Sequence, residues 1–317
     1  MIRIILDTDL AMGEPGSEID DGFALALAVA DPEIRIDLIT SVNGNTDVET
    51  ATLLSLELAQ RLGRSDIPVV RGAAAPFTRP DRARRAPRAI VDAYGHHSPT
   101  PGFAAQAIVT HVMSNPGEIT IVAIGPLTNI AAAMLLEPAL ASTVREIVIM
   151  GGIFLSQTFQ SSMPGEFNVW VDPEAAHAVL HSGAKLRWVG LDVTNQVRLT
   201  RAHAAQMSAS SGAFSSFAGE YTTGWIDHQH ARNPGDPSHA DSCAMHDPLA
   251  VAVVTHPDLV TWRSAYVDIV IGDGIARGAM VTDLLTSVDP PAPNCEIAVA
   301  VDVEKFMTFF LDAVTSL

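Results

Sequence analysis

Short, continuous runs of Val, Ile and Leu alternate along this chain with longer segments of helical periodicity. The runs predict strands at residues 2–6, 36–42, 68–70, 119–124, 146–150 and 186–190, and the periodic segments predict helices at 20–30, 48–62, 103–114, 127–136 and 173–182. Uninterrupted apolar runs are typical of parallel strands covered on both faces. Because such strands are joined by right-handed helical crossovers, we expect an α/β fold with one doubly wound, mostly parallel sheet and helices on both faces.

Two segments lack a clear period. Residues 73–102 are rich in Pro, Arg and Gly, and residues 201–242 begin with a helical pattern and then become irregular. Long irregular segments in compact domains are often lids or binding loops, so we expect a flap over a site in the first of them. No internal repeat or linker divides the 317 residues, and we expect a single domain over 1–317.

The chain has a formal net charge of −17. This charge repels phosphate backbones and anionic lipids, so neither nucleic acid nor a membrane is an expected partner. Cys243 and Cys295 are the only cysteines, which disfavours a disulfide framework or a structural zinc site. The apolar run at the N-terminus is too short for a signal peptide, and no stretch is long enough to cross a bilayer. We expect a cytoplasmic protein.

Four aspartates are expected to converge at one edge of the sheet. Asp7 and Asp9 stand at the carboxyl end of the first strand, where doubly wound sheets bind ligands, and Asp20 and Asp21 open the next helix. Their mutual repulsion favours a bound hard cation such as Ca²⁺ or Mg²⁺. Helix capping is the structural alternative for Asp20 and Asp21, but it does not account for the Asp7/Asp9 pair.

An Asp-x-Asp sequence after the first strand is also typical of haloacid-dehalogenase-like phosphatases. In those enzymes the first aspartate is a nucleophile and a downstream lysine stabilises it. This chain has only Lys185 and Lys305, and neither stands in a suitable context. The sequence therefore gives a phosphatase of this class little support.

Further polar motifs follow the later strands in order. They are Gly44-Asn45, Gly125-Pro-Leu-Thr-Asn129, Gly151-Gly152, Glu166-Phe-Asn168 and His246-Asp247-Pro-Leu-Ala250. With the aspartates, these motifs resemble those of the inosine–uridine-preferring nucleoside hydrolase family, and the resemblance continues through Arg277-Gly278 and residues 299–310. It implies a Rossmann-like nucleoside hydrolase fold. It also implies Ca²⁺-dependent hydrolysis of the N-glycosidic bond of purine or pyrimidine ribonucleosides, giving ribose and free base.

The same resemblance implies a Ca²⁺ site, for which Mg²⁺ is the less suitable ion. Its protein ligands would be the side chains of Asp9, Asp21 and Asp247 and the backbone carbonyl of Ile124. Oxygen ligands of this kind suit Ca²⁺. Asp7 would be an acid behind the ligands that orients its neighbours.

Two residues are implied as catalytic. Asp20 matches the general base that takes a proton from a metal-activated water, and His246 matches a histidine that protonates the departing base. Because breaking the ribosyl C–N bond builds positive charge on the sugar, a carboxylate-rich pocket would stabilise the oxocarbenium-like transition state. The residues expected at the ribose are Asn45, Met150, Glu166 and Asn168.

Most of these residues also have a structural interpretation. Asn45 could be a turn residue, Glu166 a solvated loop acid and Asn168 a local cap. His246 and Asp247 could begin a helix with proline in its first turn. That last interpretation is compatible with a role for Asp247 as a metal ligand.

Two segments near the expected site depart from the family pattern. The loop at 10–19 is longer than usual; it could bring Glu14 or Glu18 to the pocket, but we expect it to bulge outward. Gln160 stands where the family often has an asparagine near the 5′-hydroxyl. Contact of Gln160 with that hydroxyl is therefore left open.

The base pocket is expected from residues of the flap and of the segment at 201–242. The candidates are His96, Tyr221, Trp225 and His228. Alternatively, Tyr221 and Trp225 lie four residues apart and pack a helix onto the core. The resemblance further implies a homodimer or homotetramer, and a non-catalytic nucleoside-binding or ribose-binding protein is a third alternative.

Overall fold

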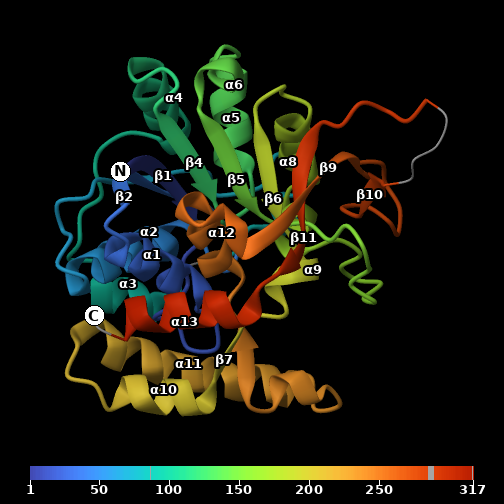
Figure 1. Ribbon diagram of the computed structural model, residues 1–317. Coiled ribbons are helices and arrows are strands. Elements are labelled where there is room, and N and C mark those ends of the chain that lie inside the picture. Colours follow the sequence, from blue (N-terminus) through green and yellow to red (C-terminus); the bar gives the residue numbers. More distant parts are fainter. Residues whose placement is uncertain (86, 285–288, 316) are drawn as a thin grey trace.

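The protein is described by a computed structural model that covers residues 1–85, 87–284, 289–315 and 317. Within these residues a nine-stranded sheet has the order β10-β9-β11-β6-β5-β4-β1-β2-β3 (Figure 1). Its strands are β1 (Ile2–Thr8), β2 (Ile34–Ser41), β3 (Val69–Arg71), β4 (Ile119–Ala123), β5 (Glu146–Met150), β6 (Leu186–Val189), β9 (Val260–Ile269), β10 (Met280–Asp283) and β11 (Cys295–Val301). The pairs from β3 to β11 are parallel, whereas β9 is antiparallel to both of its neighbours. The predicted α/β class with a mostly parallel sheet is confirmed.

Helices cover both faces of this sheet (Figure 1). One face packs against α1 (Asp20–Ala30), α2 (Val48–Arg61), α12 (His246–Thr255) and α13 (Val303–Val314). The other packs against α4 (Ala104–Ser114), α5 (Thr128–Leu136), α6 (Leu140–Thr143) and α8 (Pro173–Leu180). Successive residues of a strand point to opposite faces, so Ile4 and Leu6 enter the first core and Ile5 enters the second.

The segment at 201–242 is more regular than its sequence indicates. It forms α10 (Arg201–Ser208), α11 (Ala213–Arg232) and the 3-10 helix η2 (Pro237–His239), and it lies between the two strands of a small sheet, β7 (Arg198–Thr200) and β8 (Ser242–Ala244). The flap at 73–102 contains the 3-10 helix η1 (Pro80–Arg82) and α3 (Arg88–Tyr94). Short elements complete the described chain: α7 (Phe167–Val171), α9 (Leu191–Thr194) and η3 (Pro257–Leu259). None of the described helices is both long and apolar enough to cross a membrane.

The antiparallel strands β9 and β10 were not anticipated. β10 is the edge strand and has no buried residue, and β9 beside it mixes buried positions with exposed and partly exposed ones. Uninterrupted apolar runs indicate strands that are buried on both faces, and half-exposed strands such as β9 lack such runs. The parallel strands that were anticipated match the structure to within two residues at either end.

Candidate active site

The expected site residues lie where several strands end. Asp9 follows β1, Asn45 follows β2, Ile124 follows β4 and Met150 closes β5. Because β2, β1, β4 and β5 are neighbours in the sheet, their carboxyl ends meet. The start of α12 reaches the same place, since α12 packs on α1.

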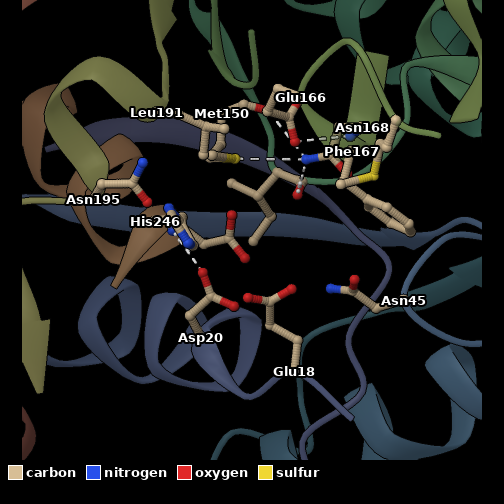
Figure 2. Close-up of a pocket in the computed structure, with 13 residues that line it drawn as sticks. Glu18, Asp20, Asn45, Met150, Glu166, Phe167, Asn168, Leu191, Asn195 and His246 are labelled. Atoms are coloured by element: carbon tan, nitrogen blue, oxygen red, sulfur yellow. Dashed lines mark hydrogen bonds between the residues drawn. The ribbon is translucent and has the colours of Figure 1, made fainter. Parts of the chain in front are cut away.

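A cavity of about 180 Å³ opens at this edge (Figure 2). Eight residues expected in the site line it: Asp20, Asn45, Ile124, Met150, Glu166, Asn168, His246 and Asp247. Its wall combines apolar side chains with acids and amides. The cavity therefore offers a small organic molecule both packing surface and hydrogen-bond acceptors.

Three carboxylates gather at the cavity floor. Oxygens of Asp20, Asp21 and Asp247 lie within 4.8 Å of one another, and all three residues are buried. The backbone N–H of Asp247 donates to Asp20 Oδ2 at 3.1 Å, whereas Asp20 Oδ1 is buried without a hydrogen-bond partner among the described residues. Both helices that begin here, α1 and α12, direct their N-termini at these acids, which favours negative charge.

Asp9 is held beside this group by close backbone contacts. Its Oδ2 accepts the N–H of Asn45 at 2.6 Å, and its Oδ1 is buried with no hydrogen-bond partner in the part of the chain that the structure describes. A Cβ at Gly44 would lie 1.9 Å from Asp9 Oδ2, and one at Gly125 would lie 2.9 Å from Asp9 Oδ1. The two motif glycines therefore provide the room that the Asp9 carboxylate occupies.

Asp21 is fixed by its neighbours on two strands. It accepts hydrogen bonds from the hydroxyl of Thr8 and, at 3.1 Å, from the side-chain amide of Asn45. Asn45 thus links Asp9 to Asp21 through its backbone and its side chain. This is more than the turn role that its position after a glycine indicates.

Asp7 stands behind the cavity and does not line it. Its Oδ1 accepts hydrogen bonds from the Thr40 hydroxyl at 2.5 Å and from Asn129 Nδ2 at 2.8 Å. Asn129 also donates to the carbonyl of Ser41 and accepts the N–H of Ala73. Asp7 therefore fixes the ends of β2 and β3 around the site.

The electrostatics of the acids call for a cation. Burial, and then the charge of Asp21, raise the pKa of Asp20 to about 7. Burial raises the pKa of Asp21 to about 6, and burial with neighbouring carboxylates raises the pKa of Asp9 and of Asp247 well above the ordinary value. A divalent ion would relieve this repulsion. The unpartnered oxygens of Asp9 and Asp20 and the all-oxygen donor set fit a hard cation such as Ca²⁺.

Glu166 and Asn168 form the opposite wall. Glu166 is the N-cap of α7, and its carboxylate accepts the backbone N–H groups of Gly152, Asn168 and Val169. It is 3% exposed, so it is not a solvated loop acid. Burial raises the pKa of Glu166 to about 7. Asn168 Nδ2 donates to the carbonyls of Ile124 at 3.0 Å and of Met150 at 3.2 Å.

His246 begins α12 beside Asp247. Its Nδ1 lies 2.7 Å from the Thr194 hydroxyl, with either atom as donor. Burial, and then the positive charges of Arg198 and His239, lower the pKa of His246 to about 4. The imidazole is therefore neutral at pH 7, and donation to a leaving base would come from a neutral N–H.

The long loop at 10–19 turns inward at its end. Glu18 lines the cavity. Its carboxylate points into the cavity between the carboxylate of Asp20 and the side-chain amide of Asn45 (Figure 2). Glu14 does not line the cavity. The expected outward bulge is therefore wrong for Glu18, because buried residues on both sides, Met12 and Ile19, fix the path of the loop.

The expected base-pocket residues do not line this cavity. His96 is exposed, and its ring lies against that of His97 at a tilt of 36°, with centroids 4.2 Å apart. Tyr221 packs against Phe217, and both Tyr221 and Trp225 lie against the core, as the alternative interpretation states. His228 stacks on Trp225 and contacts the long loop at Gly16.

Gln160 is exposed and lies in a neighbouring hollow formed with residues 153–164 and 275–280. The cavity itself is completed by residues that sequence reasoning missed. These are Met163, Phe167, Leu191 and Asn195. Leu191 and Asn195 follow β6 in the chain, so their place after a strand was an available signal.

Comparison with known proteins decides what this arrangement is. The sequence profile described as inosine-uridine preferring nucleoside hydrolase matches residues 4–308. The chain belongs to this family. It is therefore a nucleoside hydrolase, an enzyme of the glycosidase class, and the predictions of family and enzyme class are confirmed. The phosphatase reading has no support from this match.

Similar proteins agree over the full length of the nucleoside hydrolase. It is 35% identical over 311 residues to a non-specific ribonucleoside hydrolase RihC of Salmonella newport, a match that covers 96% of this chain and 95% of the relative. The plant nucleoside hydrolase PpNRh1 superposes with a TM-score of 0.85 at 28% identity, covering 100% of this chain and 99% of that one. A purine-preferring ribonucleoside hydrolase from Gardnerella vaginalis gives 0.83 at 27% identity, covering 99% and 98%.

Proposed function

We propose that this protein hydrolyses the N-glycosidic bond of purine or pyrimidine ribonucleosides with the help of a bound Ca²⁺, releasing ribose and free base. The observation that carries the proposal is the group of buried carboxylates, Asp20, Asp21 and Asp247, at the floor of a cavity lined by polar and apolar side chains. Relatives named as non-specific and as purine-preferring ribonucleoside hydrolases support the substrate class.

Asp9, Asp21, Asp247 and the carbonyl of Ile124 would hold the cation. Asp9 Oδ1 is unpartnered, and the Ile124 carbonyl accepts one hydrogen bond from Asn168, which leaves it a second lone pair. When bound, Ca²⁺ supplies Lewis-acid chemistry and ordering of the cis hydroxyls of the sugar. Mg²⁺ is the less suitable ion, because it demands a more regular and more hydrated shell.

Asp20 acts as the general base. Its Oδ2 is held by the N–H of Asp247, and its buried Oδ1 is free to take a proton from the attacking water. The water oxygen then bonds to C1′ as the C1′–N bond breaks. General-base assistance of this kind typically contributes about 10²–10⁴ in rate.

Glu166, Asn168 and Asn45 orient the ribose. Backbone N–H groups fix the Glu166 carboxylate, and its remaining lone pairs accept from sugar hydroxyls. The side-chain amides of Asn168 and Asn45 donate to protein groups, so their oxygens are left to accept. Met150 adds an apolar contact at the same wall. Negative groups on both sides stabilise the positive charge that develops on the sugar.

His246 lies at the side of the cavity that receives the base. With Thr194 donating to its Nδ1, the ring would carry its proton on Nε2 and donate it to the leaving base. The broken C1′–N electron pair stays with the base nitrogen, and this proton neutralises it.

An assay of ribose release tests the proposal. The protein is incubated with Ca²⁺ and a panel of ribonucleosides, and reducing sugar and free base are measured. We expect release that chelator abolishes and Ca²⁺ restores, and a loss of about 10²–10⁴ in kcat for Asp20→Asn with Ca²⁺ binding retained by calorimetry. Chelator-resistant release refutes the metal role, and binding without turnover supports the non-catalytic alternative.

We also propose that the enzyme works in the cytoplasm as a homodimer or homotetramer. Both cysteines are buried free thiols, which suits a reducing compartment. Phe159 and Ile275, beside the hollow next to the cavity, are 87% and 79% exposed, which suits a subunit interface. Light scattering on the purified protein gives the oligomeric state, and a monomer at micromolar concentration contradicts the proposal.

A further inference from the structure

Glu18 is delivered to the cavity by a built loop. Leu10 and Met12 are fully buried at the start of the 10–19 segment, and Ile19 is 1% exposed at its end. Gly13 and Gly16 turn the chain between them with positive φ angles of 125° and 78°, which other residues rarely adopt. The position of Glu18 therefore follows from packing and turn geometry.

The Glu18 carboxylate has no hydrogen-bond partner among the described residues. It points into the cavity between Asp20 and the Asn45 amide (Figure 2), and burial, with the nearby charges of Asp20, Asp21 and Glu166, raises the pKa of Glu18. The guanidinium of Arg84 partly opposes this effect, but Arg84 is exposed and does not line the cavity. Among the described residues, no lysine or arginine lines this space.

A divalent cation does not neutralise this cavity. When ionised, Asp9, Asp21 and Asp247 carry three negative charges, one more than such an ion supplies. Asp20 and Glu18 add further carboxylates on the same side, and the buried, unpartnered Asp20 Oδ1 also awaits a ligand group. The Glu18 carboxylate points into the cavity (Figure 2), so it faces the space for the substrate.

We propose that Glu18 is a specificity-determining residue that favours nucleosides whose base carries a positive charge, such as pyridinium ribosides and N7-alkylated purine ribosides. This inference rests on the proposed function. A cationic nucleoside brings its charge into the cavity, where Glu18 attracts it with little screening by water. A neutral nucleoside carries no charge when it binds, and positive charge develops on its sugar only as the C1′–N bond breaks.

The reaction of such a substrate balances without an added acid. Water bonds to C1′ and gives its proton to Asp20, while the C1′–N bond breaks. The electron pair of that bond stays on the ring nitrogen and cancels its positive charge, so the base leaves as a neutral molecule. The products are ribose, the neutral base and one proton.

The test compares nicotinamide riboside, a permanent cation, with neutral inosine. The measured quantity is the ratio of their kcat/KM values, in which the intrinsic reactivities cancel when variants are compared. We expect Glu18→Gln to lower this ratio about tenfold, or about 1.4 kcal/mol, and Glu18→Asp to restore most of it. Glu14→Gln, on the same loop but outside the cavity, is the matched control and should leave the ratio unchanged.

Each outcome decides something. Ribose release from both substrates with the same ratio in wild type and Glu18→Gln overturns the inference and leaves the proposed function standing. Release from neither substrate by wild type overturns both. Weakening of Ca²⁺ affinity by tenfold or more in Glu18→Gln, measured by calorimetry, makes Glu18 a metal ligand and also overturns the inference. Equal melting temperatures of the variants exclude misfolding as the cause.

Discussion

Replacing Asp20 by Asn should stabilise the metal-free protein while it abolishes most activity. Burial, and then the charge of Asp21, raise the pKa of Asp20 from 3.8 to about 7. An acid with a raised pKa in the folded state is harder to ionise there, so stability falls as the pH rises from about 4 to about 7. A rise of about three in the pKa, at about 1.4 kcal/mol for each pKa unit, lowers the free energy of unfolding by up to about 4 kcal/mol above pH 7.

The asparagine carries no charge and keeps an oxygen that can accept the N–H of Asp247. In chelator at pH 8 we expect a higher melting temperature for Asp20→Asn than for wild type, by roughly 5–10 °C. The gain should be small at pH 3, below the unfolded pKa of 3.8, where Asp20 is largely protonated in both the folded and the unfolded state, and it should shrink in saturating Ca²⁺. Scanning calorimetry at the two pH values measures it. A variant that is less stable than wild type at pH 8 in chelator refutes the electrostatic reasoning.

Three further changes test other parts of the site and fold. Gly44→Ala places a Cβ 1.9 Å from Asp9 Oδ2 and should weaken Ca²⁺ binding about tenfold or more by calorimetry, whereas Gly224→Ala, in open space, should not. Burial would raise the pKa of the Asp37 carboxylate, but hydrogen bonds from His111 and Arg3 lower it. Asp37→Asn removes this carboxylate and should reduce the free energy of unfolding in urea by about 1–3 kcal/mol at pH 7. The loss should become smaller as the pH falls through the lowered pKa of Asp37. His96→Ala, at an exposed flap position, should leave KM for inosine within about twofold, because its ring lies outside the cavity; a tenfold rise would contradict this placement.

The fold could be predicted because its buried strands consist largely of continuous runs of Val, Ile and Leu. Ile119–Ala123 and Glu146–Met150 are buried throughout, so their composition alone identifies them. β9 reads differently, since one side of it faces solvent along much of its length. The full length of helix α11 was not anticipated for another reason: glycines and polar residues interrupt its pattern, and α10 and the core stabilise it from outside.

The catalytic floor could be predicted for a similar local reason. Asp9 and Asp21 stand at fixed places, the end of a strand and the start of a helix, and topology brings those places together. The base side could not be predicted, because it depends on how long connections fold. Trp225 stacks on His228 against Gly16 of the long loop, and nothing in the spacing of these residues indicates that contact.

The two helices that begin at the carboxylates explain why the site can exist before a cation binds. The N-terminus of α12 donates the N–H of Asp247 to Asp20, and α1 begins at Asp20 itself. Helix N-termini favour nearby negative charge, by about 2 kcal/mol at most. The repulsion and burial costs at Asp20 alone exceed that on the basis of its raised pKa. The helices therefore orient the acids and offset part of their cost, and a bound cation must supply the rest, so saturating Ca²⁺ should raise the melting temperature of the wild-type protein.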